Sequence, residues 1–389
     1  MPKYKIAWMP GDGVGHDVMN AARLVVDKLA LDAEYVPADI GWEFWRNEGD
    51  ALPKRTIDAL KSTDCALFGA ITSKPQDEAR EELAPHLRDK GLQYFSPIVR
   101  LRQLFNLHTN MRPCKSYPGN PLNFRGSAST NPSGTDVLVD QVVFRENTEG
   151  MYGGVEFFPL PEPVYTALCA NAKMKPWKDK GLDNVALSTR IMSVQGCTSI
   201  CRQAFEYAKK FGRERVTLIE KPNVLRETGG LMTRCFRAVA AEYPSIRADE
   251  ANIDAICMWM LKNPQDYDVL VAENMFGDIV SDLCAGLVGG LGFAPSANIG
   301  DTYAVFEPTH GSAPKYAGRG VVNPIAMLLT AKLMLDWLGE TDKAARLELA
   351  IAAVIAEGRT QTYDMKGVPA GSREAATTTQ MAQAIAAKL

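Results

Sequence analysis

The stretch "MPGDGVGHDV", residues 9–18, follows the apolar segment "KYKIAWM" and leads into a helical pattern. A strand, a glycine-rich turn and a helix in this order are typical of a loop that binds dinucleotide phosphates. That fingerprint requires GxGxxG, however, and His16 occupies the third glycine position. Glu34 lies near the distance at which a ribose-binding acid is expected, which strengthens the likeness. The turn therefore does not match the dinucleotide-binding fingerprint, and the fold has to be inferred from the rest of the chain.

The composition is that of an ordinary globular protein. Apolar residues make up 46% and charged residues 23% of the 389 residues, a length that predicts about two domains. The net charge of -3 gives no reason to expect a nucleic acid or an anionic membrane as partner. No apolar run approaches the ~18 residues that span a bilayer, and no signal-peptide pattern precedes the first apolar segment. The eight cysteines are scattered without a zinc-binding set, so we expect reduced, mostly buried thiols in a cytoplasmic protein.

Short aliphatic runs alternate with longer helical patterns along the chain. "KIAWM", "VMNAARLVVDKLA" and "CALFGAI" are examples. This alternation predicts an α/β fold with a mainly parallel sheet and helices on its faces. Residues 151–184 contain several prolines and little periodicity, which predicts an irregular arm. The highly charged segment 73–95 is expected to be a surface helix with loop ends.

Acidic residues in "NMFGDIVSD" form the first candidate site. Asp278 and Asp282 are four residues apart, so on a helix both carboxylates share one face. Because like charges at this spacing repel, a positive group is expected nearby. Oxygen-only ligands suit Mg²⁺ or Mn²⁺ better than zinc, although for the pair taken alone two solvated acids at a helix start are the simpler interpretation. Asp254, an acid that enters an otherwise apolar segment, is the third candidate.

Basic and aromatic residues form the second group of candidates. Arg102, Arg112 and Arg145 lie near the ends of apolar segments in an acidic chain. Converging guanidinium groups predict a polycarboxylate substrate, whereas each arginine alone is explained by a surface ion pair. Lys221 follows the strand-like "VTLIE", and a lysine near other cations can act as a base, although a solvated lysine is the simpler interpretation. Tyr152 is expected to be a half-buried aromatic.

The stretch "FEPTHGSAPKYAGRGVVNP", residues 306–324, is the last candidate site. Small residues after a strand let backbone amides approach a phosphate closely. The alternative is a plain turn between a strand and a helix.

Taken in order, these motifs resemble the β-decarboxylating dehydrogenases, the group of isocitrate, 3-isopropylmalate, homoisocitrate and tartrate dehydrogenases. The resemblance covers essentially the whole chain and rests on "PGDGVG", "RLRQLFNLHTNMRP", "FRENTEGMYGG", "KPNVL", "NMFGDIVSDLCAGLVGGLGFAPSANIG" and "FEPTHGSAPKYAG". It implies an isopropylmalate-dehydrogenase-like two-domain α/β fold and not a Rossmann fold. Residues 1–107 and 290–389 would form a large cofactor-binding domain, and 108–289 a small dimerisation domain with a clasp-like arm near 146–190.

The resemblance also implies an oxidative decarboxylation of a 3-substituted malate, a di- or tricarboxylate 2-hydroxy acid. Arg102, Arg112 and Arg145 match the carboxylate-binding arginines of the family. Asp278, Asp282 and Asp254 of the partner subunit would hold Mg²⁺ or Mn²⁺. Lys221 would reach across a homodimer with shared active sites to take a proton, and Tyr152 would help to protonate C3.

In the family the cofactor lies chiefly on the "HGSAPKYAG" loop, and the "GDGVG" turn only helps to line the cleft. Lys315 followed by Tyr316 is the NADP-like pair, and Tyr363 matches a second NADP-type position. The arginine of strict NADP enzymes is replaced by Gly367, with Lys366 beside it. The resemblance therefore favours NADP, with NAD as the alternative. The implied cofactor-binding residues are His310, Gly311, Ser312, Ala313, Pro314, Lys315, Tyr316, Asn323 and Tyr363.

The residues expected to recognise the C3 substituent give a mixed signal. Ser96 matches the serine that isocitrate enzymes direct at the γ-carboxylate, whereas Ile98 and Val99 resemble the apolar wall of isopropylmalate enzymes. The segment 73–95 is longer than in typical isocitrate dehydrogenases. Isocitrate is the first choice, and 3-isopropylmalate, homoisocitrate, tartrate or another 3-substituted malate are the alternatives. A non-catalytic regulatory subunit is disfavoured because such chains usually lose a metal-binding acid, an arginine or the tyrosine.

Overall fold

The computed structural model describes residues 2–126, 131 and 133–389. Its strands are β1 Tyr4–Gly11, β2 Ala33–Pro37, β3 Cys65–Ala70, β4 Thr109–Lys115, β5 Asp140–Glu146, β6 Glu156–Phe157, β7 Leu187–Ser188, β8 Arg215–Glu220, β9 Arg247–Asn252, β10 Val269–Ala272, β11 Pro295–Ile299 and β12 Ala304–Pro308. Its α-helices are α1 Gly15–Lys28, α2 Trp42–Glu48, α3 Lys54–Leu60, α4 Gln76–Glu81, α5 Pro97–Leu104, α6 Glu162–Leu168, α7 Val194–Phe211, α8 Thr228–Ala240, α9 Ile253–Lys262, α10 Asn274–Leu287, α11 Ile325–Trp337, α12 Thr341–Glu357, α13 Tyr363–Lys366 and α14 Thr378–Ala386.

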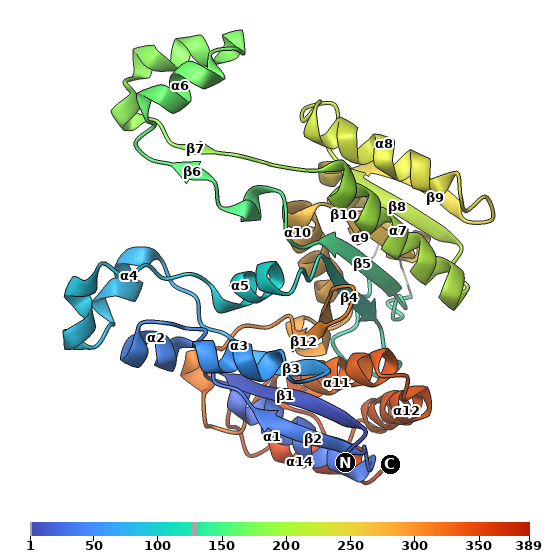
Figure 1. Ribbon diagram of the computed structural model, residues 1–389. Coiled ribbons are helices and arrows are strands. Elements are labelled where there is room, and N and C mark those ends of the chain that lie inside the picture. The colour runs from blue at the N-terminus through green and yellow to red at the C-terminus, as the bar shows by residue number, and fades with distance from the viewer. Residues whose placement is uncertain (1, 127–130, 132) are drawn as a thin grey trace.

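One ten-stranded sheet runs through the described part of the chain, in the order β2-β1-β3-β12-β11-β4-β5-β10-β8-β9 (Figure 1). Its two ends are parallel, as the alternation of strands and helices predicts. The central pairs β12-β11, β11-β4 and β4-β5 are antiparallel. The mixed α/β architecture was predictable, but the antiparallel centre was not, because apolar periodicity carries no information about the direction of a neighbouring strand.

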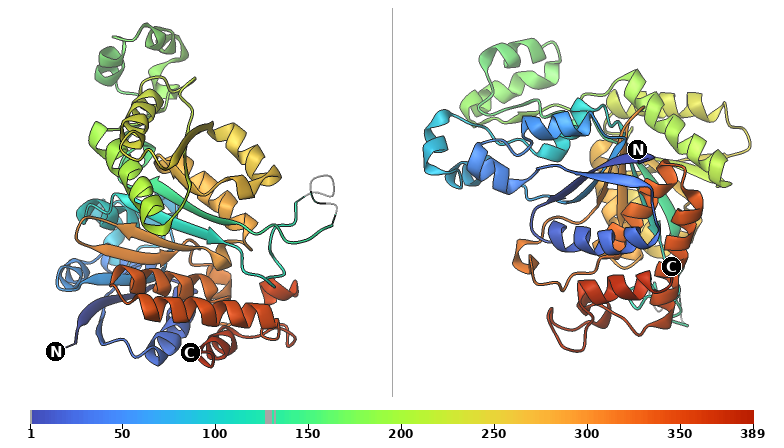
Figure 2. Two further views of the ribbon diagram at one scale, coloured as in Figure 1. Left: turned by 90° about the vertical axis from the view of Figure 1, so that its right-hand side faces the viewer. Right: turned by 60° about the horizontal axis from the view of Figure 1, so that its bottom comes forward.

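Helices cover both faces of the sheet, and strands such as β3 and β10 are buried along their whole length, whereas the edge strand β9 is largely exposed. At one end α1, α11, α12 and α14 pack into a core with strands β1, β3 and β12 (Figure 2). At the other end α7 and α8 cover one face of β5, β8 and β10, and α9 and α10 cover the opposite face. The sheet continues between the two ends, so the domain boundaries proposed from the sequence remain a prediction. Among the described helices, none combines the length and apolar character needed to cross a bilayer.

The segment predicted to be an irregular arm projects from the body of the molecule (Figure 1). It contains α6, short 3₁₀ turns and the two-stranded ribbon β6-β7. A small cluster of Leu160, Tyr165 and Val185 holds the end of the arm together. Phe158 and Trp177 are 71% and 49% exposed. The clasp-like contact of this arm with a second subunit remains a prediction.

The charged segment 73–95 contains the predicted surface helix as α4, followed by a 3₁₀ turn at Pro85–Lys90. Ala79 and Leu87 pack against Trp42 and Trp45 of α2, and Trp45 Nε1 donates to the Ala79 carbonyl at 2.7 Å. The segment therefore has a small core of its own, which its charge content concealed.

The glycine-rich turn that follows β1 packs against the protein's own backbone. The N–H of Val14 donates to the Ser312 carbonyl at 2.9 Å, and a Cβ on Gly13 would lie 2.1 Å from that same oxygen. The buried Asp12 carboxylate accepts the N–H groups of Trp42 at 2.7 Å and Thr72 at 2.8 Å. Because these close contacts join the turn to the loop after β12, the turn is a structural joint and not a free phosphate-binding loop.

We expect Gly13→Ala to lower the free energy of unfolding by about 1–3 kcal/mol more than Gly91→Ala. Both glycines have a positive φ, of 56° and 64°, so both variants carry similar backbone strain. A methyl group at Gly13 meets the Ser312 carbonyl, whereas nothing lies within 4 Å of one at Gly91. Urea denaturation of both variants measures the difference, and equal losses would show that the contact with Ser312 is unimportant.

Candidate active site

Helix α10 presents two carboxylates to the arginines of the central strands. Asp278 and Asp282 share one face of the helix, as predicted. Arg112 of β4 contacts both, since its Nη1 lies 3.2 Å from Asp278 Oδ1 and 3.3 Å from Asp282 Oδ1. The positive group expected from the spacing of the two acids is thus present.

Arg145, at the end of β5, is the most deeply buried cation of this group, with 1% of its surface exposed. Its Nη1 pairs with Asp278, and its Nε and Nη2 donate to Asn274 Oδ1 at 3.0 and 2.8 Å. The guanidinium carbon lies 5.0 Å from the centre of the Tyr152 ring. The Tyr152 hydroxyl in turn donates to Asp278 Oδ2 at 2.6 Å. The Asp278 carboxylate therefore contacts two arginines and a tyrosine.

Charge balance controls ionisation in this cluster. Burial, followed by repulsion from Arg112 and Arg102, lowers the pKa of Arg145. Burial alone would raise the pKa of Asp278, but Arg145 and Arg112 outweigh it and hold that pKa below its usual value. The pKa of Asp282 is raised, chiefly by burial. Asp278 therefore stays ionised as the counter-ion of the arginines.

Arg102 of α5 reaches the same region from the other end of the sheet. Its Nε donates to Asn298 Oδ1 at 3.0 Å, and its Nη2 lies 3.1 Å from Glu307 Oε1. Asn298 is fully buried and also accepts from Asn110 Nδ2 at 3.0 Å and Asn147 Nδ2 at 2.9 Å. The arginines are thus fixed by buried amides, which donate and accept without adding charge.

Lys221 and Asp254 lie apart from this cluster and pair with each other. Lys221 follows β8, Asp254 lies in the first turn of α9, and their Nζ and Oδ1 atoms are 2.5 Å apart. The hydrogen bond from Lys221 lowers the pKa of the Asp254 carboxyl group. Within the described residues, no group of three His, Cys, Asp or Glu side chains is close enough to hold a metal ion. One chain therefore brings together Asp278 and Asp282 without Asp254.

The residues expected to read the C3 substituent surround the start of α5. Ser96 is the residue that precedes the helix. Ile98 is 7% exposed and packs in a core cluster with Met9 and Phe68, whereas Ser96 and Val99 are only partly buried. Ile98 and Val99 were both predicted to form an apolar wall, but only Val99 is exposed enough to contact a ligand.

The loop after β12 places the predicted cofactor residues near the glycine-rich turn. Ser312 is buried, and its hydroxyl lies 2.6 Å from that of Thr72. Gly311 and Pro314 are exposed, and Ala313 has a positive φ of 36° at the start of the 3₁₀ turn Pro314–Tyr316. Loop geometry of this kind leaves the exposed part of the segment open to a ligand.

Two tyrosines and a histidine complete this region. The rings of Tyr316 and Tyr363 are 5.7 Å apart, and Lys315 Nζ lies 4.8 Å from the centre of the Tyr316 ring. Burial lowers the pKa of His310, and its Nε2 is buried without a hydrogen-bond partner among the described residues. Asn323 donates to Asp364 at 3.2 Å and accepts the N–H of Ile325 at 3.0 Å, so it fixes the start of α11.

Sequence reasoning missed the polar residues that hold the arginines. Asn110, Asn274, Asn298 and Glu307 lie inside the motifs quoted above, but their type and spacing gave no signal of their own. The pairing of β4, β11 and β12 brings Asn110, Asn298 and Glu307 together, and the packing of α10 against β5 places Asn274 beside Arg145.

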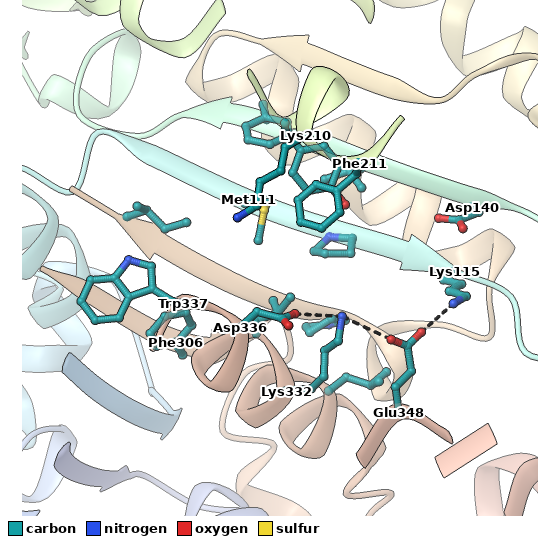
Figure 3. A pocket seen from close by; sticks show the side chains of 18 of the residues that line it. Met111, Lys115, Asp140, Lys210, Phe211, Phe306, Lys332, Asp336, Trp337 and Glu348 are labelled. Atoms are coloured by element: carbon teal, nitrogen blue, oxygen red, sulfur yellow. Dashed lines mark hydrogen bonds and ion pairs between the residues drawn. The ribbon is translucent and has the colours of Figure 1, made fainter. Parts of the chain in front are cut away.

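A cavity of about 490 Å³ lies between the sheet and helices α7 and α11 (Figure 3). Met111 and Phe144 line it, whereas the next residue in each strand, Arg112 or Arg145, belongs to the site. Successive side chains of a strand point to opposite faces. Several charged side chains that line the cavity pair with one another, for example Lys332 Nζ with Asp336 Oδ2 at 2.9 Å. The cavity is therefore separate from the candidate active site.

The family model described as isocitrate/isopropylmalate dehydrogenase matches residues 5–385. The chain belongs to this family. It is 43% identical over 98% of its length to protein DlpA of Legionella pneumophila, of which it spans 58%. It is 39% identical to the 3-isopropylmalate dehydrogenase of Archaeoglobus fulgidus, with 93% of this chain and 94% of that protein covered.

A solved structure agrees with the family assignment. The isocitrate dehydrogenase of Methylococcus capsulatus is 36% identical, with a TM-score of 0.81 and 99% of both chains covered. The predicted family and the isopropylmalate-dehydrogenase-like fold are therefore confirmed. Membership makes the chain a dehydrogenase of the class that oxidises hydroxy acids.

We expect Asn298→Ala to lower the free energy of unfolding by about 2–4 kcal/mol, because it leaves several buried partners unsatisfied. The exposed Asn184 makes one side-chain bond of 3.4 Å, so Asn184→Ala should change stability by less than about 0.5 kcal/mol. Chemical denaturation compares the two. A small effect at Asn298 would contradict its role as the hub that positions Arg102.

Proposed function

We propose that this protein catalyses the oxidative decarboxylation of a 3-substituted malate, with hydride transfer to NADP. Isocitrate, converted to 2-oxoglutarate and carbon dioxide, is the first choice of substrate. The observation that supports this most is that Arg112 and Arg145 contact the carboxylates of α10, while the buried Arg102 is close enough to both arginines to influence their charge. Three guanidinium groups in one buried region suit a substrate with several carboxylates.

The acids on α10 fit a hard divalent cation. Asp278 and Asp282 offer only oxygen donors, and Asp282 keeps 58% of its side chain exposed. We propose that Asp254 of the partner subunit completes the set for Mg²⁺ or Mn²⁺. When bound, the cation would lower the pKa of the substrate's C2 hydroxyl and stabilise negative charge on its oxygen.

Lys221 and Tyr152 are proposed to move protons. Lys221, held by Asp254 at 2.5 Å in its own chain, would take the proton of the C2 hydroxyl in the neighbouring subunit's site. The arginines hold the carboxylates, so that the carboxylate at C3 leaves as carbon dioxide once C2 is a ketone. Tyr152 lies against Arg145 and would supply the proton that C3 then accepts.

The loop after β12 fits a nicotinamide cofactor. The buried Nε2 of His310 needs a hydrogen-bond partner, and the exposed Lys315, a cation that suits a phosphate, lies beside the ring of Tyr316, which in turn lies next to Tyr363. When bound, the cofactor would accept the hydride from C2. NADP is proposed over NAD because a cation occupies the position after Pro314.

A homodimer is proposed as the working form. In α9, Met258, Trp259 and Leu261 are 44%, 41% and 50% exposed, and Ile279 of α10 is 50% exposed. These apolar side chains flank Asp254 and the two acids of α10, so a second copy covering them would bring Asp254 toward a neighbouring site. Free cysteines among the described residues accord with a cytoplasmic location.

The substrate is tested by following reduced-cofactor formation by the purified protein with Mn²⁺, using NADP and NAD in parallel. We expect isocitrate to react faster than 3-isopropylmalate, and NADP to be preferred. Faster reaction with 3-isopropylmalate would indicate that Val99, and not Ser96, recognises the substituent at C3 of the substrate. Poor rates with both would direct the search to homoisocitrate, tartrate or another 3-substituted malate.

Tyr152→Phe should reduce turnover by about 10²–10⁴-fold while substrate binding changes little, because only the proton-donating hydroxyl is lost. Steady-state kinetics measures both quantities. Tyr165→Phe is the control, since the Tyr165 hydroxyl bonds the Lys175 carbonyl in the arm at 3.0 Å. Unchanged turnover in Tyr152→Phe would remove this residue from the mechanism.

Shared active sites can be tested with the same variant. Tyr152→Phe and Lys221→Met should each be nearly inactive. Mixed and refolded together, they form some dimers in which one site carries neither change, so activity should recover above both parents. No recovery, with mixed dimers verified by mass, would show that Lys221 acts within its own chain.

A further inference from the structure

A buried arginine joins the base of the arm to the ends of two strands. Arg190, the last residue of the predicted arm, keeps only 9% of its side chain exposed. Its Nη2 lies 2.8 Å from Glu220 Oε2, and its Nε lies 3.6 Å from Glu273 Oε2. Both glutamates are 1% exposed, and no other cation among the described residues pairs with either of them. Because buried carboxylates need a counter-charge, Arg190 is the group that makes their burial favourable.

The same guanidinium group holds both ends of the segment that carries Lys221. Glu220 is the last residue of β8, and its Oε1 accepts the N–H of Lys221 at 2.9 Å while its Oε2 accepts from Arg190. The Nη1 of Arg190 donates to Thr228 Oγ1 at 3.1 Å, and Thr228 is the first residue of α8. Residues 221–227 link β8 to α8, so Arg190 bonds to the residue on either side of this link. The position of Lys221 therefore depends on Arg190.

Arg190 is itself fixed by the start of α10 and by the base of the arm. Its guanidinium carbon lies 5.1 Å from the centre of the Phe276 ring. The next residue, Ile191, accepts the backbone N–H of Gly150 at 2.7 Å, which closes the base of the arm. A Cβ on Gly150 would lie 2.9 Å from Glu273 Oε2, so the arm packs directly against this carboxylate. These contacts fix the position of Arg190 relative to the rest of the site.

We infer that Arg190 is a positioning residue that places Lys221 through Glu220. The inference rests on the proposed function, in which Lys221 takes the proton of the C2 hydroxyl in the neighbouring subunit's site. A base must lie within hydrogen-bond reach of its proton, and a displacement of about 1 Å can cost on the order of 10²-fold in rate. The contacts of Arg190 do not include the carboxylate-binding arginines, so its loss should slow turnover without weakening substrate binding. The defect should appear in the partner's site, because Lys221 acts there.

Steady-state kinetics of Arg190→Met is the first test. Turnover should fall by about tenfold to a hundredfold while KM stays within about threefold. Arg213→Met is the matched control, because Arg213 also pairs with two carboxylates, Asp140 at 2.7 Å and Asp268 at 3.0 Å. These contacts lie near the start of β8, at the other end of the strand from Lys221, so turnover should stay within about twofold. Equal losses in the two variants, or a higher KM with unchanged turnover in Arg190→Met, would overturn the inference.

Mixed dimers, isolated through a different affinity tag on each chain, locate the defect. A dimer of Arg190→Met with Tyr152→Phe keeps one site in which Tyr152 and Lys221 are both undisturbed, so its activity should exceed that of both parents. A dimer of Arg190→Met with Lys221→Met has no such site, and its activity should not exceed that of Arg190→Met.

Arg190→Lys replaces Arg190→Met if the latter does not fold. Lysine keeps the charge, but one ammonium group does not reproduce the planar fork that reaches Glu220 and Thr228 together. We expect the same pattern in the mixed dimers, with a smaller loss of turnover. Unchanged turnover in the variant that is used would overturn the inference.

The mixed dimers also separate this inference from the proposal on which it rests. Recovery with Lys221→Met but not with Tyr152→Phe would overturn the inference, since Arg190 would then act on its own subunit's site. Recovery with both or with neither would overturn it as well, because the defect would then belong to no single site. A dimer of Tyr152→Phe with Lys221→Met, prepared in the same way, tests shared active sites alone. Without recovery in that dimer both proposals are overturned, whereas with it only the role of Arg190 is at stake.

Discussion

The burial of like-charged guanidinium groups is the constraint on which the site depends. Arg145 is almost completely buried, and Arg102 and Arg112 are close enough to lower its pKa. Without counter-charge, the desolvation of such a group would make its burial strongly unfavourable, because a guanidinium group keeps its proton in a protein. Asp278 meets this need, and because α10 carries it, the position of that helix is coupled to the ends of β4 and β5.

The antiparallel pairing of β4 and β5 at the centre of the sheet places these arginines side by side. Alternate residues of β4 and β5 point to opposite faces, so Arg112 and Arg145 enter the site while Met111 and Phe144 line the cavity behind it. A shift of one residue in register would exchange the two sets. Asn298 of β11 lies directly opposite Asn110 of β4, and the hydrogen bond between their side chains stabilises this register.

The joint between the glycine-rich turn and the loop after β12 links the first and last parts of the chain. Val14 bonds the Ser312 carbonyl, and Asp12 ties the same turn to Trp42 and Thr72. This joint sets where the exposed segment with Lys315 begins. A motif that resembles a phosphate loop thus acts on the proposed cofactor site by positioning another loop.

The sequence by itself determined the α/β class, the family and the helical face shared by Asp278 and Asp282. These follow from local periodicity and from motifs whose order is specific. Only the tertiary structure decided the antiparallel centre, the hydrogen bonds that converge on Asn298 and the burial of Ile98 in the core. The physical reason is that each of these depends on a contact between residues far apart in the chain, and neither periodicity nor composition records such a contact.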